Sequence, residues 1–250
     1  MHTQPYVLML LSSSQQLRLR SGVLLECGFW AEEFLIPWHI LRESGWPVLI
    51  ATPDGRPPQV DPGSLQADNL AGDERRAQRL SAEIRSLQAV LSSVQDLRRL
   101  NPDLLQAMRG LFIPGGNGPL QDFPKSAAVA HLLCHCEGQG TPVASLCHGG
   151  AALLAVASGG RRAFCGYTVS CFRKAEEEDT PLAGDWPYHL EERLRECGYK
   201  TDLGPPWSPH WTQDRRLLSG QNPASAAALT RAFVAQLEVL RQHKGSRHGR

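Results

Sequence analysis

Residues 143–151, VASLCHGGA, join an apolar segment to a run of very small residues. This pattern predicts a buried strand that turns sharply into a helix. A cysteine at such a turn has the layout of a nucleophile elbow, where small neighbours leave room for a strained backbone. The N-terminus of the following helix favours the thiolate of Cys147, and the adjacent His148 can take or relay a proton. From this segment alone, a buried structural cysteine beside a hydrogen-bonded histidine is an equally good interpretation.

Apolar runs and helical patterns alternate on both sides of this stretch. The expected strands are 6–12, 46–52, 111–114 and 142–147, and the expected helices are 30–44, 125–137 and 149–157. Such alternation is typical of a parallel sheet that helices cover on both faces. The expected fold class is therefore α/β, with a parallel sheet sandwiched by helices.

One long stretch interrupts the alternation. Residues 54–68 are rich in the turn-forming residues Pro, Gly and Asp, and residues 73–109 are charged, with apolar positions three or four apart. The sequence LNPD at 100–103 predicts a break between two helices. We interpret residues 54–109 as a small helical cap insertion that packs over one edge of the sheet.

The 250 residues suit one large domain, which we expect to span residues 1–242. The basic segment HKGSRHGR at 243–250 is expected to be a disordered tail. A second irregular region at 175–210 contains an expected helix near 187–197.

The charges are balanced, with 26 Lys and Arg against 25 Asp and Glu and a net charge of +1. This balance gives no general attraction to nucleic acid or to an anionic membrane, so neither is expected as a partner. No apolar run reaches the roughly 18 residues of a membrane span, and the N-terminus lacks the charged segment of a signal peptide. We therefore expect a cytoplasmic protein.

The seven cysteines are odd in number and irregularly spaced, which argues against a disulfide framework. The run Cys134-His135-Cys136, with His131 one turn earlier, has the composition of a metal cluster. Structural zinc sites, however, combine two separated groups of ligands, and no second group is evident. An ordinary amphipathic helix is the better interpretation, and no metal or cofactor is expected.

Two further segments carry candidate chemistry. In IPGGNG at 113–118, glycines let backbone N–H groups approach a ligand oxygen, as an oxyanion hole requires, although a simple turn fits as well. In FWAEEFLIP at 29–37, one of the two glutamates is expected to point inward, where it needs a partner or becomes protonated. The run EEED at 176–179 is by itself more typical of a solvated face.

Together these segments resemble the PfpI superfamily, also called the DJ-one/ThiJ family, and within it the branch of the thirty-one-kilodalton heat-shock chaperone and glyoxalase. The similar blocks are GFWAEEFLIP (28–37), ATPDGRPPQVDPGS (51–64), FIPGGNGPLQDFP (112–124), ASLCHGGAALL (144–154), TVSCFRKAEEE (168–178), PYHLEERLRECGY (187–199) and LLSGQNPASAAAL (217–229). The resemblance implies a flavodoxin-like domain of the class I glutamine amidotransferase type with a small cap. It also implies a homodimer.

The resemblance implies Cys147 as the nucleophile and His148 as its neighbour. It implies the backbone N–H groups of Gly116 and His148 as oxyanion donors. Glu33 corresponds to the buried glutamate that contacts the cysteine or the substrate. Glu176 corresponds to the acid that orients the histidine.

The register of that acid is open by one position, so Glu177 is the alternative to Glu176. Asn117 stands where much of this branch has His, and Cys171 and Arg173 replace the usual Gly and Pro around Phe172. These departures bear on the substrate more than on the fold.

Related glutamine amidotransferases need a His-x-Glu pair late in the chain. The corresponding segment, 220–223 (GQNP), has neither residue, and His189-Leu190-Glu191 is interpreted as an exposed helix start. Glutaminase activity is therefore not expected.

The activity that the resemblance implies is a cysteine-dependent, glyoxalase-like lyase reaction. It would convert methylglyoxal-type 2-oxoaldehydes, which are small-molecule carbonyl substrates, to hydroxy acids without a cofactor. Two alternatives stay open: a stress- or redox-responsive holding chaperone, and a hydrolase or hydratase of a specialised metabolite.

Overall fold

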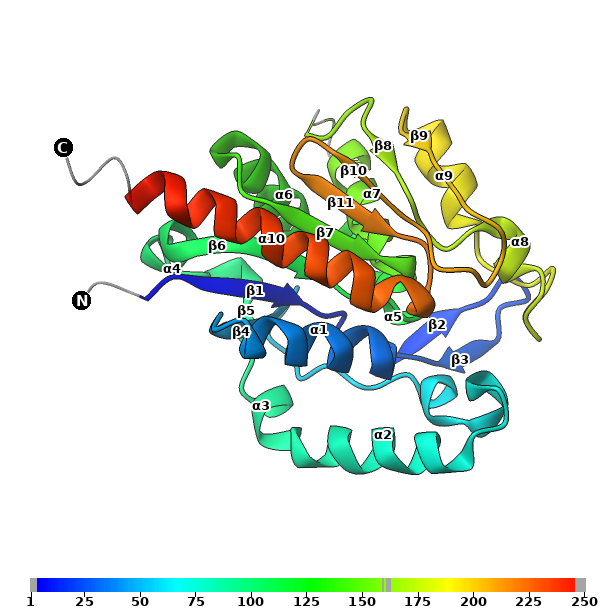
Figure 1. The fold of residues 1–250 in the computed structure, drawn as a ribbon. Coiled ribbons are helices and arrows are strands. Elements are labelled where there is room, and N and C mark those ends of the chain that lie inside the picture. The colour runs from blue at the N-terminus through cyan, green and yellow to red at the C-terminus, as the bar shows by residue number, and fades with distance from the viewer. Residues whose placement is uncertain (1–3, 159, 161–162, 246–250) are drawn as a thin grey trace.

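A seven-stranded sheet in the order β10-β11-β7-β6-β1-β4-β5 forms the centre of the protein (Figure 1). A computed structural model describes residues 4–158, 160 and 163–245. The strands are β1 (Tyr6–Leu10), β4 (Val48–Thr52), β5 (Gln95–Asp96), β6 (Met108–Ile113), β7 (Val143–Leu146), β10 (Trp211–Asp214) and β11 (Leu217–Gly220). Neighbouring strands are parallel except β10 and β11, which form an antiparallel hairpin at one edge. The prediction of an α/β fold with a mostly parallel sheet is therefore confirmed.

Helices and two small additional sheets connect these strands, and the last helix follows the final strand. The helices are α1 (Ala31–Glu43), α2 (Glu74–Ser86), α3 (Gln88–Ser92), α4 (Pro102–Ala107), α5 (Gly118–Asp122), α6 (Ala127–Gln139), α7 (Ala152–Ser158), α8 (Lys174–Glu177), α9 (Leu190–Glu196) and α10 (Ala226–Gly245). The small sheets pair β2 (Gln16–Arg18) with β3 (Leu24–Glu26), and β8 (Thr168–Val169) with β9 (Lys200–Thr201).

Strand β1 shows why both faces of the sheet are buried. Successive side chains of a strand point to opposite faces, and every residue of β1 is apolar and buried. Leu8 and Leu10 pack in the core cluster that includes α6 and α7, whereas Val7 and Met9 pack with α1 and α10. Helices α1 and α10 lie side by side over one face (Figure 1). The two-sided layering follows from this continuous apolar run.

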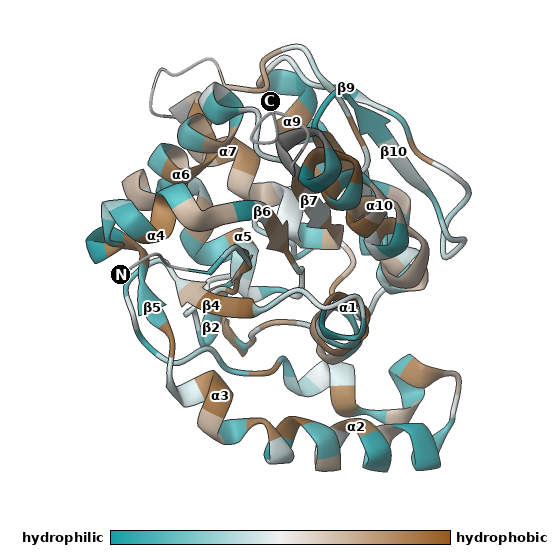
Figure 2. Cartoon of the chain, turned by 60° about the vertical axis from the view of Figure 1, so that its left-hand side comes forward, coloured by the Kyte–Doolittle hydropathy of each residue, from teal (hydrophilic) through white to brown (hydrophobic). Residues whose placement is uncertain are grey.

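The cap lies on α1 and is shorter than the predicted insertion at 54–109. Asp73 is the N-cap residue of its main helix, α2, and its carboxylate accepts the N–H of Arg76 at 2.9 Å. Ile84 of α2 and Leu91 of α3 join the same core cluster as α1. Figure 2 shows α2 and α3 below α1. The rest of the predicted insertion belongs to the main domain, because β5 extends the central sheet and α4 packs on its other face.

Helix α10 extends further than expected at the C-terminal end. It continues to Gly245, so residues 243–245 of the predicted tail are helical, and residues 246–250 lie outside the described residues. In the described part of the chain, no helix combines the length and the apolar character that crossing a bilayer requires.

Candidate active site

Cys147 lies at the carboxyl end of β7, in the turn that leads into a short 3-10 segment, Cys147–Ala151. Its φ of +56° is a conformation that side chains disfavour, so the turn is strained. Gly149 is needed here, because a Cβ at this position would lie 2.4 Å from the carbonyl oxygen of Ile113. The strand, cysteine and tight turn that the sequence predicts are therefore present, and Cys147 is 6% exposed.

Glu33 reaches Cys147 from the first turn of α1. It is fully buried, and its Oε2 accepts the N–H of Gly115 at 2.8 Å. Its other oxygen, Oε1, is buried without a nitrogen or oxygen partner among the described residues, and the thiol of Cys147 interacts with this carboxyl. Burial raises the pKa of Glu33 from 4.5 to about 8. The prediction that one glutamate of this pair points inward is met by Glu33.

The pKa of Cys147 moves opposite to the expectation from the helix N-terminus. Burial raises it well above the ordinary value of 9.0, and the carboxylate of Glu33 raises it further. The N–H of His148 lowers it, but burial and the like charge of Glu33 outweigh this contribution. The thiol therefore keeps its proton in the resting protein, and a neighbouring base has to remove that proton before the sulfur can act as a nucleophile.

His148 is held between an acid and two aromatic rings. Its Nε2 lies 3.0 Å from Oε1 of Glu177, and both residues are almost fully buried. The ring packs edge-on against Phe172 and at a tilt against Trp186, with centroid distances of 4.8 and 5.4 Å. These contacts fix the imidazole and leave Nδ1 as its nitrogen available to a ligand.

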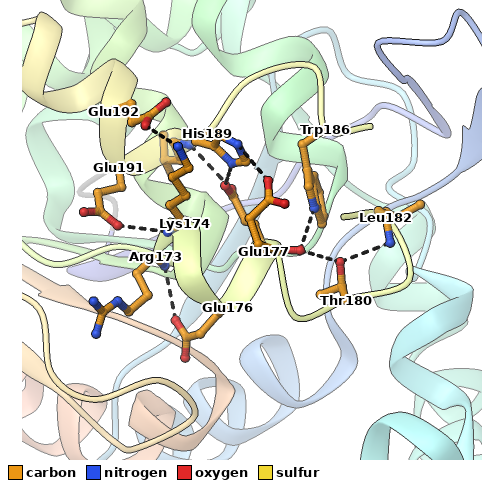
Figure 3. Close-up of polar contacts among 12 residues, drawn as sticks. Arg173, Lys174, Glu176, Glu177, Thr180, Leu182, Trp186, His189, Glu191 and Glu192 are labelled. Carbon is orange, nitrogen blue, oxygen red and sulfur yellow. Dashed lines mark hydrogen bonds and ion pairs between the residues drawn. The ribbon is translucent and has the colours of Figure 1, made fainter. Parts of the chain in front are cut away.

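Glu177, and not Glu176, contacts His148, which corrects the first choice made from the sequence. The two glutamates are adjacent in α8, so their side chains leave the helix in different directions (Figure 3). Glu177 also accepts from Nδ1 of His189 at 2.5 Å through its Oε2. A one-residue shift on a helix turns a side chain by about 100°, and the run of acidic residues gave no reason to choose between the two.

Glu176 instead holds the loops that surround the site. Its Oε1 accepts from the backbone N–H of Trp207 and from Nδ2 of Asn222, both at 2.7 Å. Its Oε2 accepts the N–H of Arg173 at 3.2 Å. An ionised carboxylate accepts hydrogen bonds only, so three donors around one buried group form a consistent set.

Substitution by glutamine is expected to separate these two roles. In Glu176→Gln, an amide NH₂ faces donors, which should lower the free energy of unfolding by about 1–3 kcal/mol and change kcat little. In Glu177→Gln, kcat/KM should fall by roughly 100-fold, because the orienting carboxylate of His148 is lost. Denaturant unfolding and steady-state kinetics of both variants check this. A larger loss of kcat/KM in Glu176→Gln than in Glu177→Gln would show that Glu176 is the acid that orients His148.

A cavity of about 780 Å³ opens directly above Cys147 and His148. Its walls combine aromatic side chains and carboxylates, namely Trp30, Phe172, Trp186 and Trp207, and Glu26, Asp61, Asp68 and Asp179. Gly116 and Asn117 of the predicted oxyanion loop also line it. The cavity is large enough to enclose a small molecule.

Asp61 is a buried residue of this site that the sequence analysis missed. Its Oδ1 accepts the N–H of Gly63 at 3.0 Å, and its Oδ2 accepts the N–H of Asn117 at 3.3 Å. It therefore ties the start of the cap to the oxyanion loop, and burial raises its pKa. The available signal was the Asp-Pro-Gly-Ser turn at 61–64, in which Asp caps a short helical segment.

Of the three departures from the family pattern, only Asn117 lines the cavity. Cys171 is fully buried in the core, and the guanidinium of Arg173 donates to the carbonyl of Gly204 at 2.7 Å. All seven cysteines are free. Among the described residues, no group of His, Cys, Asp and Glu side chains is arranged to hold a metal ion.

Comparison with known proteins identifies the family. The sequence model of the DJ-1/PfpI family matches residues 22–236. The chain belongs to the DJ-1/PfpI family. It is similar to the protein/nucleic acid deglycase HchA of Escherichia coli, at 28% identity over 96% of this chain and 82% of that protein.

Solved structures of the DJ-1/PfpI type share the fold. The 24 kDa Rapid Encystment Protein of Francisella tularensis superposes with a TM-score of 0.79 at 23% identity, over 94% of this chain and 99% of that one. Glyoxalase III of Candida albicans gives a TM-score of 0.75 at 20% identity, over 92% and 96% of the two chains. The flavodoxin-like architecture implied by the resemblance is thereby confirmed.

The structure brings together four of the five site residues predicted from the sequence. It also adds His189, which the sequence analysis interpreted wrongly. Cys147, His148 and Gly116 line the cavity, and Glu33 is buried against Cys147, while Glu176 lies behind the wall. His189 was interpreted as exposed, but it is only 9% exposed and contacts Glu177. The spacing His-x-Glu was its only signal, and that spacing is also common at helix starts.

Proposed function

We propose that this protein is a cysteine-dependent, glyoxalase-like enzyme that converts 2-oxoaldehydes such as methylglyoxal to 2-hydroxy acids without glutathione. The observation that carries the proposal is the cysteine at the floor of a cavity, flanked by one buried carboxyl and one oriented imidazole. The similarity to a deglycase and the shared fold with a glyoxalase III support it.

In the first step, the sulfur of Cys147 attacks the aldehyde carbon while the carboxylate of Glu33 takes the thiol proton. A pKa of about 8 suits Glu33 to this exchange, because the group can gain and lose a proton near neutral pH. Glu33 then returns this proton to the alkoxide oxygen, and the product is a hemithioacetal. The N–H groups of Gly115, Asn117 and Gly118 are used by Glu33, Asp61 and Gly28, which leaves that of Gly116, with that of His148, for the oxyanion.

In the second step, Nδ1 of His148 removes the proton from the former aldehyde carbon and gives an enediolate. The hydroxyl next to sulfur passes its proton to the neighbouring oxygen, and His148 returns the proton it holds to the neighbouring carbon. The result is a 2-hydroxyacyl thioester of Cys147. Water hydrolyses this thioester, releases the hydroxy acid and restores the thiol, so the net reaction consumes one oxoaldehyde and one water.

Lactate formation from methylglyoxal by the purified protein tests the proposal. Turnover without added thiol is expected, and addition of glutathione should not raise it. Background turnover combined with a reactive Cys147 would contradict the proposal and favour a hydrolase or hydratase. Suppression of client aggregation without any turnover would favour a chaperone. The homodimer stays a prediction, which the solution mass of the protein tests.

The charges of the cavity predict which aldehydes are accepted. Among the described lining residues, the charged side chains are the four carboxylates, and no Lys or Arg is present. A 2-oxoaldehyde that carries its own carboxylate, such as 4,5-dioxopentanoate, should therefore have a kcat/KM at least roughly tenfold below that of methylglyoxal. Phenylglyoxal should be accepted well, because its ring can pack against the tryptophans.

Competition kinetics with the three aldehydes check this selectivity. Asp68→Asn, at an exposed position of the cavity wall, should improve turnover of 4,5-dioxopentanoate relative to methylglyoxal. Asp103→Asn, at an exposed position in α4 outside the cavity, is the matched control. Equal use of 4,5-dioxopentanoate and methylglyoxal by the native enzyme would show that the carboxylates do not select the substrate.

A further inference from the structure

Behind His148, a second imidazole lies between two carboxylates. Nδ1 of His189 is 2.5 Å from Oε2 of Glu177, and its Nε2 is 3.0 Å from Oε1 of Glu178. Glu177 in turn contacts Nε2 of His148 through its other oxygen. The four side chains form one continuous series from the floor of the cavity to the surface, where the Glu178 side chain is 39% exposed. Figure 3 shows the contact between Glu177 and His189.

The chemistry of the partners restricts the protonation state of His189. An ionised carboxylate can only accept hydrogen bonds, and a neutral imidazole has only one N–H to donate. Nδ1 of His189 is hydrogen-bonded to Glu177, and Nε2 lies at ion-pair distance from Glu178. Both contacts are attractive together only when both ring nitrogens carry a proton, because an unprotonated nitrogen would face a carboxylate oxygen with its lone pair. His189 is then an imidazolium ion that shares its charge between Glu177 and Glu178.

We propose that His189 is a positioning residue, which as an imidazolium neutralises Glu177 and thereby keeps His148 as a neutral base. With its charge already paired, Glu177 needs only the Nε2–H of His148 to complete its hydrogen bonds. Nδ1 of His148 then keeps its lone pair and faces the cavity. For its kinetic readout this inference rests on the proposed function, but the charge state of His189 does not.

The surrounding charges are consistent with this assignment. Glu192, on the helix that His189 begins, also interacts with His189 and is paired with Lys174 at 2.7 Å. Glu191 faces away, since it accepts from the N–H of Lys174 and pairs with Arg195. Three carboxylates therefore act on His189, and Lys174 offsets the most distant of them.

On the other side of Glu177, the groups around His148 are Cys147 and Asp61, together with the neutral rings of Phe172 and Trp186. Asp61 interacts electrostatically with His148. Glu177 is in direct contact with His148, and in this proposal its charge is paired by His189. The imidazolium of His189 is what opposes a second proton on His148.

Removal of this cation should therefore deactivate His148 at low pH without dismantling the site. In His189→Asn, the amide nitrogen can donate to Glu177 from about the position of Nδ1, but it carries no charge. A buried, unpaired Glu177 would then draw a second proton onto His148, which could no longer accept one from the substrate. The rising limb of the pH profile of kcat/KM should shift upward by about one pH unit, and activity should recover at high pH.

Two measurements on the native chain and three variants test the proposal. The first is ¹⁵N NMR of the imidazoles, where His189 is expected to carry protons on both nitrogens from about pH 6 to about pH 8, and His148 on Nε2 alone. The second is the pH profile of kcat/KM for His189→Asn and Glu178→Gln. Glu178→Gln should shift the rising limb of this profile in the same direction as His189→Asn but by a smaller amount. Glu196→Gln changes an exposed acid on α9 and should not shift the limb.

The outcomes separate this inference from the proposed function. A neutral His189 in the native protein, or a His189→Asn variant whose loss of activity is equal at every pH, overturns the inference even if turnover is robust. Doubly protonated His189 in a protein without aldehyde turnover would contradict the proposed function and leave the charge assignment intact. Thermal unfolding of the variants distinguishes misfolding from both.

Discussion

Cys147→Ala is expected to reduce lactate formation from methylglyoxal by at least about a thousandfold, to the background of the uncatalysed reaction. After substrate binding, every intermediate of the proposed reaction is covalently attached to the sulfur of this residue. The cavity and the oxyanion donors remain in the variant, but without a covalent intermediate they have no charge to stabilise. Stability should not fall in parallel, because the substitution removes one atom from a strained position.

A matched control comes from the other buried cysteines. Cys136 in α6 is fully buried, and burial raises its pKa as it raises that of Cys147, but it does not line the cavity. Cys136→Ala should keep full turnover. Intact-mass spectrometry during turnover should show an acyl adduct on the native protein and none on Cys147→Ala. Full activity of Cys147→Ala would reject the covalent mechanism.

Glu33→Gln is expected to change activity and stability in opposite directions. The amide cannot take the thiol proton, so kcat/KM should fall by roughly 100-fold or more. Glutamine has nearly the same shape, and its carbonyl oxygen can still accept the N–H of Gly115. The loss is therefore chemical, and it should appear in kcat as well as in kcat/KM.

The stability effect follows from the raised pKa of Glu33. The folded protein holds this proton until about pH 8, whereas an unfolded chain releases it near 4.5. Between these values the folded state binds more protons than the unfolded state, so the free energy of unfolding falls as the pH rises through this window. The cost of the buried charge is on the order of 5 kcal/mol above pH 8. Glu33→Gln removes this cost.

Denaturant unfolding at about pH 5 and about pH 8 measures this difference. The free energy of unfolding of Glu33→Gln should exceed that of the native protein mainly at the higher pH. Glu32→Gln is the matched control, since Glu32 is the neighbouring residue, is 7% exposed and pairs with Arg76 of the cap rather than with Cys147. An equal stability difference at both pH values would mean that Glu33 is ionised in the fold at every pH tested.

The regular part of this fold was predictable because it depends on patterns that are local in sequence. The apolar strands and the amphipathic helices lie within a few residues of their expected positions, as 30–44 against Ala31–Glu43 illustrates. The limits of the cap were not predictable in the same way. Residues 95–96 join the sheet through pairing with β4, and the sequence between 73 and 109 does not encode that distant partner.

Local sequence therefore predicted which residues belong to the candidate site: a cysteine at a strand end, glycines in the turns, and glutamates within apolar segments. The tertiary structure decided how these residues act on one another. It selected Glu177 over Glu176, because the direction of a helical side chain depends on how the helix docks. It raised the pKa of the thiol against the helix N-terminus, because burial and Glu33 outweigh one N–H. It also placed His189 behind His148, because charges far apart in the chain interact only once folding removes the water between them.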